Sequence, residues 1–548
     1  MRGWGPLTAV CLGTFMLLLD VTIVVVALPD MAKALGASLS DLQWVVDGYA
    51  LALAALLLGV GAAADILGRR RVHVAGVVLF AAASLLCGLA SGPGTLVAAR
   101  AVQGVGAAAM FATTLPLLGS VYEGRRRSAA LGVWGAVSGG AAAVGPIAGG
   151  LLAEGPGWRW IFFVNLPVSV VSVWLTLRVV PESTGPRGKR VDWAGTGAFA
   201  AFAGGTTYAV VRAGEDGWTA TATAASFLLA ALALVCFVLV ERRAAHPLLD
   251  LALLRRPAFV GVLVGALAFS GVAFGVTPYL SIWMQTLLGM SPVRGGLTLL
   301  PMTVAAMVTA IVVGKRLDGV PARLTIGGGL LLIGAGCLAQ AVLGAGSDWR
   351  ALVPGFVLVG VGTGFVSPTV AGAALAAVEP ARHGMAGGAV NTVRQLGYAL
   401  GVAVFGTVLT SRMADDLPRG TAHAVAGGGA AAFEGVVPAH TLRAAFAAGL
   451  DAALVAAGCA GLVAGLLVLL LVRAPRVAAG AGATDSAAGT AADAAVGTVP
   501  DPTAGTVTDS SVGTVPDPTA GAVTDAAATP VTDSAVAALS EEKVARRP

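Results

Sequence analysis

Four polar residues lie within segments that are otherwise strongly apolar: Asp20, Asp47, Arg100 and Gln103. Asp20 interrupts the stretch from 12 to 29, which is long enough to cross a lipid bilayer. A carboxylate at such a depth costs roughly 2.5–3.5 kcal/mol on insertion scales, so membrane helices keep one where it meets a partner or an aqueous path. We therefore predict that Asp20 faces an internal path.

The rise of an α-helix places these groups near the same face of the membrane. Asp20 and Gln103 are both about 12 Å from the outer ends of their segments, while Arg100 is about 8 Å and Asp47 about 6 Å deep. Arg100 and Gln103 share one helix face with Gly104.

Burial raises the pKa of a carboxyl group and a nearby guanidinium lowers it, so Asp20 beside Arg100 can exchange a proton for a cationic ligand. We predict a proton-coupling and substrate path formed by these polar groups. The alternatives are a fixed structural ion pair for Asp20 and Arg100, and a plain interfacial carboxylate for Asp47.

A loop with fixed polar and glycine positions, GAAADILGRRR at 61–71, follows the second apolar segment. Its glycines permit close backbone approach, its aspartate can accept from basic groups or cap the next helix, and its arginines suit an anionic inner leaflet. A plain basic loop would explain the arginines but not the placed aspartate and glycines. We predict a gating loop made of Gly61, Asp65, Gly68, Arg69 and Arg70.

The fifth apolar segment contains SGGAAAVGPIAGG at 138–150. A proline inside a helix removes one backbone hydrogen bond and bends the helix, and small residues let a neighbour pack closely. Because the chain has 76 Gly, glycine content alone proves little, and the prediction of a kink depends on the fixed spacing of Gly145, Pro146, Gly149 and Gly150.

Two other polar groups have simpler expected roles. Arg394 lies near the inner end of its segment, where we expect it to snorkel to the membrane surface, with a coupling role as the alternative. Tyr279, Trp283, Met284 and Gln285 end another segment, where an aromatic belt at the outer interface is expected and a ligand-lining role is the alternative.

The amino-acid composition indicates that this chain is a polytopic membrane protein. Of its 548 residues 57% are hydrophobic and only 11% charged, whereas soluble domains carry about 25% charged residues. The net charge of +5 arises from basic residues between apolar segments, which indicates membrane topology and no nucleic-acid partner. The five cysteines are scattered, so they predict neither disulfides nor a zinc site. The sequence has no GxxxxGK[ST] loop, which disfavours transport driven directly by ATP.

Hydropathy predicts an all-α protein with fourteen membrane spans. They lie near 6–28, 43–64, 73–91, 95–119, 128–152, 159–180, 193–212, 219–240, 258–285, 295–314, 324–344, 351–376, 386–410 and 446–472. With the N-terminus inside, 21 basic residues fall on the cytoplasmic side and 8 outside, so both termini are expected in the cytoplasm. We expect a six-helix bundle at 1–180, two inserted helices at 181–257, a second bundle at 258–476 and a disordered tail at 477–548, with a loop at 411–445 holding at most short helices.

Five ordered motifs resemble the major facilitator superfamily, and specifically its fourteen-span drug:proton antiporter branch. They are LDVTIVVVALP (19–29), GAAADILGRRR (61–71), LVAARAVQGVGAA (96–108), GPIAGG (145–150) and WRWIFFVNLP (158–167). The resemblance implies two six-helix bundles plus two inserted central helices, with Arg100 as the coupling arginine. The chain departs from the branch at Val25, where asparagine is usual, and at Ala141, where glycine is usual.

The resemblance also implies a function, which is proton-driven export by alternating access across a bacterial cytoplasmic membrane. We expect a monomeric transporter, not an enzyme, that carries small amphipathic or cationic substrates and needs no cofactor besides the proton gradient. The alternatives are a dedicated exporter of one self-made metabolite, such as an antibiotic, and an uncoupled facilitator or sensor on the same fold.

Overall fold

The computed structural model describes residues 4–184, 191–245, 247–316, 320–378, 383–433 and 435–472. Within these ranges all regular structure is helical, which confirms the predicted all-α class. The tail predicted at 477–548 lies outside the described residues. We describe the compact unit Met1–Pro475 by itself.

The N-terminal half contains seven helical elements. They are α1 (Gly5–Leu35), α2 (Leu39–Leu67), α3 (Arg69–Gly88), α4 (Pro93–Val121), α5 (Gly124–Glu154), α6 (Trp160–Phe163) and α7 (Asn165–Val179). Local sequence sets their ends: Gly36 closes α1 with φ +62°, and Ser38 begins α2 with a reciprocal capping box to Asp41. We call the two ends of the bundle the Gly5 end and the Leu35 end, after the first and last residues of α1.

Two inserted helices, α8 (Trp193–Asp216) and α9 (Thr221–Arg243), connect the halves through the short helix η1 (Leu251–Arg255). Asp192 caps α8 by accepting a hydrogen bond from the backbone nitrogen of Gly195 at 2.7 Å. Large apolar side chains cover the exposed face of α9, as expected for contact with lipid: Leu228, Leu229, Leu232 and Val235.

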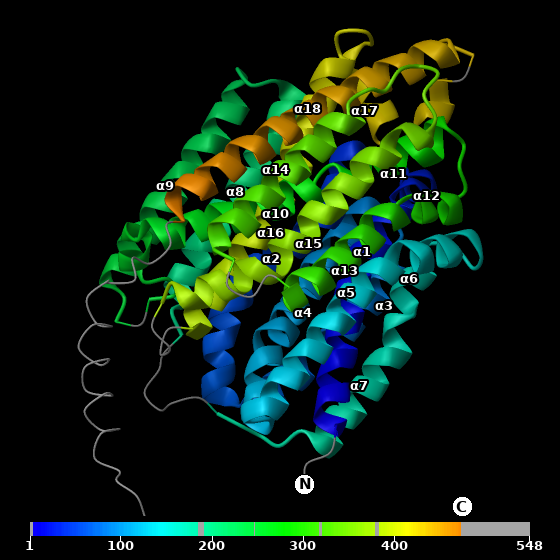
Figure 1. The fold of residues 1–548 in the computed structure, drawn as a ribbon. Coiled ribbons are helices and arrows are strands. Elements are labelled where there is room, and N and C mark those ends of the chain that lie inside the picture. The colour runs from blue at the N-terminus through cyan, green and yellow to red at the C-terminus, as the bar shows by residue number, and fades with distance from the viewer. Residues whose placement is uncertain are drawn as a thin grey trace, which may run out of the picture. The chain divides into compact units, whose positions relative to one another are not determined.

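The C-terminal half contains the remaining elements. They are α10 (Pro257–Phe274), α11 (Thr277–Ile282), η2 (Trp283–Leu287), α12 (Pro292–Thr298), α13 (Leu300–Arg316), α14 (Ala322–Gln340), η3 (Trp349–Leu352), α15 (Val353–Ala376), α16 (His383–Met413), α17 (Arg419–Ala426), η5 (Ala430–Phe433) and α18 (Ala439–Leu471). In Figure 1 the long helices lie side by side, and α14 packs between α15 and α18.

All fourteen predicted spans coincide with helices. In the part of the chain that the structure describes, 12 helices are long and apolar enough to cross a membrane. The helices α5 and α8 are not among them, and α8 is diluted by glycine and threonine in the run GGTTY at 204–208, so the count of fourteen spans stays a prediction. The predicted loop at 411–445 does hold short helices, α17 and η5, but it is shorter than predicted because α18 already begins at Ala439.

The two halves meet mainly through α2 against α16 and α5 against α12. Four hydrogen bonds join the halves within the described ranges. Three are at the Leu35 end: Gln43 to Tyr279, Gln285 to Val26 and Val293 to Glu154. The fourth joins Thr392 to Ala54 near the middle of α2, where helix packing is already close.

The inserted helix α8 touches both halves. A Cβ added to Gly59 of α2 would lie 2.6 Å from the hydroxyl oxygen of Thr196 on α8, which shows how closely these helices approach. On its other side, the hydroxyl of Thr407 on α16 donates to the carbonyl of Val210 on α8 at 3.0 Å.

Candidate functional site

Asp20 lies in the middle of α1 and is 0% exposed. One of its carboxylate oxygens accepts from Arg100 Nη1 at 2.6 Å. The other accepts from the side-chain amides of Gln103 and Asn165, both at 2.9 Å. The structure therefore brings together Asp20, Arg100 and Gln103, as the sequence predicts, and in this conformation the carboxylate has no contact with water.

Arg100 is held from several sides on α4. It donates to the carbonyl of Val45 at 3.0 Å and to the amide oxygen of Gln103 at 2.6 Å. Its guanidinium also lies over the ring of Tyr49, 4.3 Å from the centroid. Because a buried cation is stable only when its donors are used, this arrangement fixes both the position and the charge of Arg100.

Two residues of this cluster are absent from the sequence prediction, Asn165 at the start of α7 and Ser84 on α3. The hydroxyl oxygen of Ser84 accepts from Gln103 at 2.7 Å and from Asn165 at 3.2 Å, so it completes the shell around the Asp20 carboxylate. A signal for Asn165 was available, since it is the one amide in the apolar segment 158–167.

Asp47 is also 0% exposed, so the alternative of a plain interfacial carboxylate is wrong. It lies on the face of α2 that packs on α16, because Gln43, Asp47, Ala54 and Leu58 recur at helical spacing and three of them contact α16. Neither carboxylate oxygen has a hydrogen-bond partner among the described residues. A buried carboxyl group without a partner is stable only in its neutral, protonated form.

Tyr279 joins the two halves next to Asp47. Its hydroxyl accepts from Gln43 at 2.9 Å and donates to the carbonyl of Val402 on α16. Tyr279, Trp283 and Met284 are at most 1% exposed, so the aromatic-belt prediction is wrong. The belt prediction failed because α11 and the π-helix η2 that continues it bury these side chains within the protein.

The predicted gating loop is attached to the segment that follows α7. Asp65 accepts from Arg69 at 2.9 Å, and the N-cap of α3 is Gly68, so Asp65 does not cap that helix. The backbone nitrogen of Arg70 donates to Glu182 at 3.0 Å. Glu182 is a further residue that the sequence prediction missed.

The arginines of this loop differ in what they contact. Arg69 binds Asp65 and Arg70 binds the carbonyl of Val180, whereas contact of these two arginines with lipid headgroups stays a prediction. Arg71 is 77% exposed at its side chain and remains available to the membrane surface. The space at Gly61 is ordinary, because an added Cβ would be 3.7 Å from the nearest atom.

We expect Gly68→Ala to lower the thermal stability of the loop and of the purified protein. Gly68 has φ +107°, where a side chain is strained, and an added Cβ would lie 2.8 Å from the Glu182 carboxylate. The strain alone costs about 1–2 kcal/mol. Gly61→Ala is the matched control, and equal melting temperatures for the two variants in detergent would contradict the requirement for glycine at 68.

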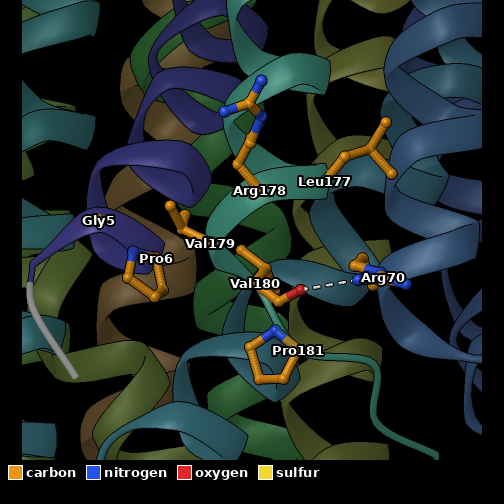
Figure 2. A pocket seen from close by; sticks show the side chains of 8 residues that line it. All are labelled: Gly5, Pro6, Arg70, Leu177, Arg178, Val179, Val180 and Pro181. Carbon is orange, nitrogen blue, oxygen red and sulfur yellow. Dashed lines mark hydrogen bonds between the residues drawn. The ribbon is translucent and has the colours of Figure 1, made fainter. Parts of the chain in front are cut away.

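A cavity of about 450 Å³ opens at the Gly5 end between α1, α3 and α7. Figure 2 shows Arg70 donating a hydrogen bond to the carbonyl of Val180 at this cavity, while the side chain of Arg178 points away from that carbonyl. The cavity is about 22 Å from Asp20, because 15 helical residues separate Gly5 from that carboxylate. It is therefore separate from the buried polar cluster.

The glycines and proline predicted to kink α5 are buried at two helix crossings. A Cβ on Gly149 would lie 2.8 Å from the carbonyl of Ile23 on α1, and one on Gly145 would collide with Thr22. A Cβ on Gly150 would lie 2.6 Å from Val293, and Pro146 contacts Gly296, both on α12 of the other half. The small residues therefore let α5 cross between the halves, as the sequence predicts, whereas the bend itself stays a prediction.

The chain is similar to known transporters along most of its length. The profile of the Major Facilitator Superfamily matches residues 10–402. Multidrug resistance protein Stp of Mycobacterium tuberculosis (strain CDC 1551 / Oshkosh) is 35% identical over 406 residues, covering 74% of this chain and 75% of that protein. Puromycin resistance protein pur8 of Streptomyces alboniger is 38% identical over 457 residues, covering 82% and 89%.

A solved structure shows the same fold. A bacterial homologue of the human lysosomal transporter Spinster, in an inward-facing and unoccupied conformation, matches with a TM-score of 0.60 at 17% identity, over 86% of this chain and 98% of that one. These similarities confirm the family inferred from the five sequence motifs. The chain belongs to the Major Facilitator Superfamily and is a multi-pass membrane transporter, not an enzyme.

Proposed function

We propose that this protein is a proton-coupled efflux transporter that exports amphipathic drugs or antibiotics across the bacterial cytoplasmic membrane. The relatives named for multidrug resistance and for puromycin resistance support export of small toxic compounds. The proton gradient is the energy source and no bound cofactor is required. The excess of basic residues on the loops of the Gly5 end supports an orientation with that end and both termini in the cytoplasm.

The contrast between two buried carboxyl groups carries the proposal of proton coupling. Asp20 is ion-paired with Arg100 at 2.6 Å, whereas Asp47 has no partner among the described side chains. One carboxyl group is therefore held charged and the other neutral, in the same half of the transporter. Groups with such opposed environments are the ones that exchange protons when the environment changes.

Alternating access gives these groups their change of environment. Three of the four hydrogen bonds between the halves are at the Leu35 end, which is the outer side in the proposed orientation. This conformation is then closed to the outside. Opening the outer side breaks the Gln43–Tyr279 contact beside Asp47, which exposes that carboxyl group to water and lets it release its proton or gain one.

The amphipathic character of the substrate fits an apolar cavity on α1 and α5. This cavity of about 520 Å³ is lined by Trp4, Leu7, Thr8, Cys11, Leu12, Phe15, Val133 and Val137. It is at the Gly5 end, which is the proposed cytoplasmic side, so it can receive the apolar part of a compound before export. A dedicated exporter of a single antibiotic is the second candidate, because one relative is named for puromycin alone.

We expect purified protein in proteoliposomes to export drugs only when a pH gradient is imposed. A susceptibility panel in an efflux-deficient host first identifies the transported compounds, and resistance to several unrelated classes favours the multidrug function over the dedicated one. Adding such a compound to energised vesicles should then release protons, as a pH-sensitive dye reports. Transport that is independent of the gradient would contradict proton coupling, and protein-free liposomes are the control.

A further inference from the structure

Arg394 on α16 is a half-buried cation that no described carboxylate neutralises. Its guanidinium makes no hydrogen bond or ion pair with any described residue, and its Nε atom is buried without a partner. It lies over the ring of Phe269 on α10, 5.1 Å from the centroid, and that ring is 1% exposed. The prediction that Arg394 snorkels to the membrane surface is therefore wrong.

An arginine in this state lowers the stability of the folded protein. The guanidinium carries five N–H donors and does not lose its charge, so burial of its Nε–H group without an acceptor costs free energy. Arg100 shows how the same chain treats a structural arginine: it gives that side chain a carboxylate, an amide oxygen and a backbone carbonyl. Contact with the ring of Phe269 offsets only a small part of the cost for Arg394.

Arg394 lies on the helix face that turns toward the other half. Tyr398 is four residues further along α16 and so shares this face. Tyr398 is close enough to Asp47 and Arg100 for their charges to act on its hydroxyl group. Arg394 therefore lies one helical turn from Tyr398 on the side of the Gly5 end, and part of its side chain remains accessible.

No carboxylate in the described ranges of the C-terminal half can pair with Arg394. Asp451 accepts from the backbone nitrogen of Leu343, while three others lie in or beside ion pairs near the Leu35 end: Asp348, Asp415 and Asp416. The accessible donors of Arg394 are therefore free to bind an acceptor on a compound that enters the path.

We propose that Arg394 binds an acidic group on the exported compound, so that the substrates include amphipathic acids with a carboxylate or phenolate. The inference rests on the proposed function and narrows its substrate class, because the sequence led us to expect amphipathic or cationic substrates in general. Phe269 contacts the guanidinium, and the N–H donors that remain suit the two oxygen atoms of a planar anion.

Two matched probes test this inference by equilibrium binding to the purified full-length protein in detergent at pH 7. Anthraquinone-2-carboxylate carries the acidic group, and anthraquinone-2-carboxamide has the same ring system without the charge. We expect the wild-type protein to bind the acid about 10- to 100-fold more tightly than the amide, as expected for a charged hydrogen bond. Arg394→Gln should remove this preference without changing the affinity for the amide.

Three further measurements guard against a merely structural effect. Arg394→Lys should keep part of the preference, because the charge stays while the planar fork is lost. Arg212→Gln on α8 is the matched control, since Arg212 pairs with Asp216 far from this face, and it should bind both probes like the wild type. The melting temperature of Arg394→Gln should not fall, because the substitution removes an unpaired charge.

The inference is overturned if the wild type shows no preference for the acid, or if Arg394→Gln binds both probes equally less well or keeps the preference. These binding measurements need no proton gradient, so they separate the inference from the proposed function. Preferential binding without gradient-driven efflux would contradict the function alone. Gradient-driven efflux of both probes at equal rates, unaffected by Arg394→Gln, would contradict the inference alone.

Discussion

Asp20→Asn is expected to reduce gradient-driven efflux to the level of protein-free liposomes. The asparagine fits the same space and still meets Gln103 and Asn165, but it can neither bind nor release a proton. Arg100 keeps its charge and loses its only carboxylate partner within the described residues. Because a buried ion that loses its partner costs about 3–5 kcal/mol, the variant should also be less stable than the wild type.

Transport and folding have to be measured separately for this variant. Size-exclusion chromatography reports whether the purified protein is intact, and exchange of labelled substrate across vesicles without a gradient reports whether the halves still move. Asp216→Asn is the matched control, because it removes a carboxylate from an exposed arginine pair of 2.8 Å on α8. Undiminished efflux by an intact Asp20→Asn protein would remove Asp20 from the mechanism.

Asp47→Asn should have the opposite profile, with unchanged stability and strongly reduced coupling. Since Asp47 is buried without a partner among the described groups, it is already neutral in this conformation, and a neutral amide of the same size replaces it at little cost. Export requires the group to change its protonation state, which an amide cannot do. We expect the melting temperature to stay close to that of the wild type, while the substrate gradient that a pH difference sustains falls about tenfold.

Proteoliposomes with an imposed pH difference measure that substrate gradient, and a detergent melt measures stability. A loss of stability as large as that of Asp20→Asn would show that Asp47 is charged and paired in the native state. The neighbouring residue offers a control, because Gln43→Glu places a carboxyl group one turn away, next to Tyr279 instead. If this variant restored coupling to Asp47→Asn, the exact position of the carboxyl group would not matter.

Hydropathy alone located every long helix of the fold. Apolar segments separated by charged or glycine-rich loops are long-range signals, and the structure begins and ends its helices within a few residues of most predicted limits. The largest deviations are of seven residues: α1 continues to Leu35, and α18 starts early because the amphipathic segment after Pro438 continues the helix. The count of fourteen spans depends on α5 and α8, and the glycines and threonines of α8 lower its hydropathy below that of a plain span.

The sequence predicted the site correctly where the depth of a residue along its helix was enough to identify its partners. Asp20, Arg100 and Gln103 met as expected because they share one depth and a complementary charge. Asn165 and Ser84 were missed because helix rotation decides which polar side chains face one another, and apolar helices give little rotational signal.

Errors arose wherever neighbours decide whether a residue is exposed. Depth placed Asp47 near the membrane surface, but it is buried on α2, which packs on α16. Arg394 appeared able to reach the surface, whereas packing against Phe269 holds it within the protein. A single sequence does not specify which helices from the other half lie beside these residues.

The inserted helix α8 has a mechanical consequence for any rocking motion. It is in close contact with Gly59 of one half and bonded to Thr407 of the other. When the halves tilt in opposite directions, α8 cannot move with both of them. At least one of its two contacts, with Gly59 or with Thr407, therefore has to slide. Sliding at these two side-chain contacts, which lie outside the substrate path, therefore limits the rocking motion. Loosening either contact should change the turnover rate without changing the substrate affinity.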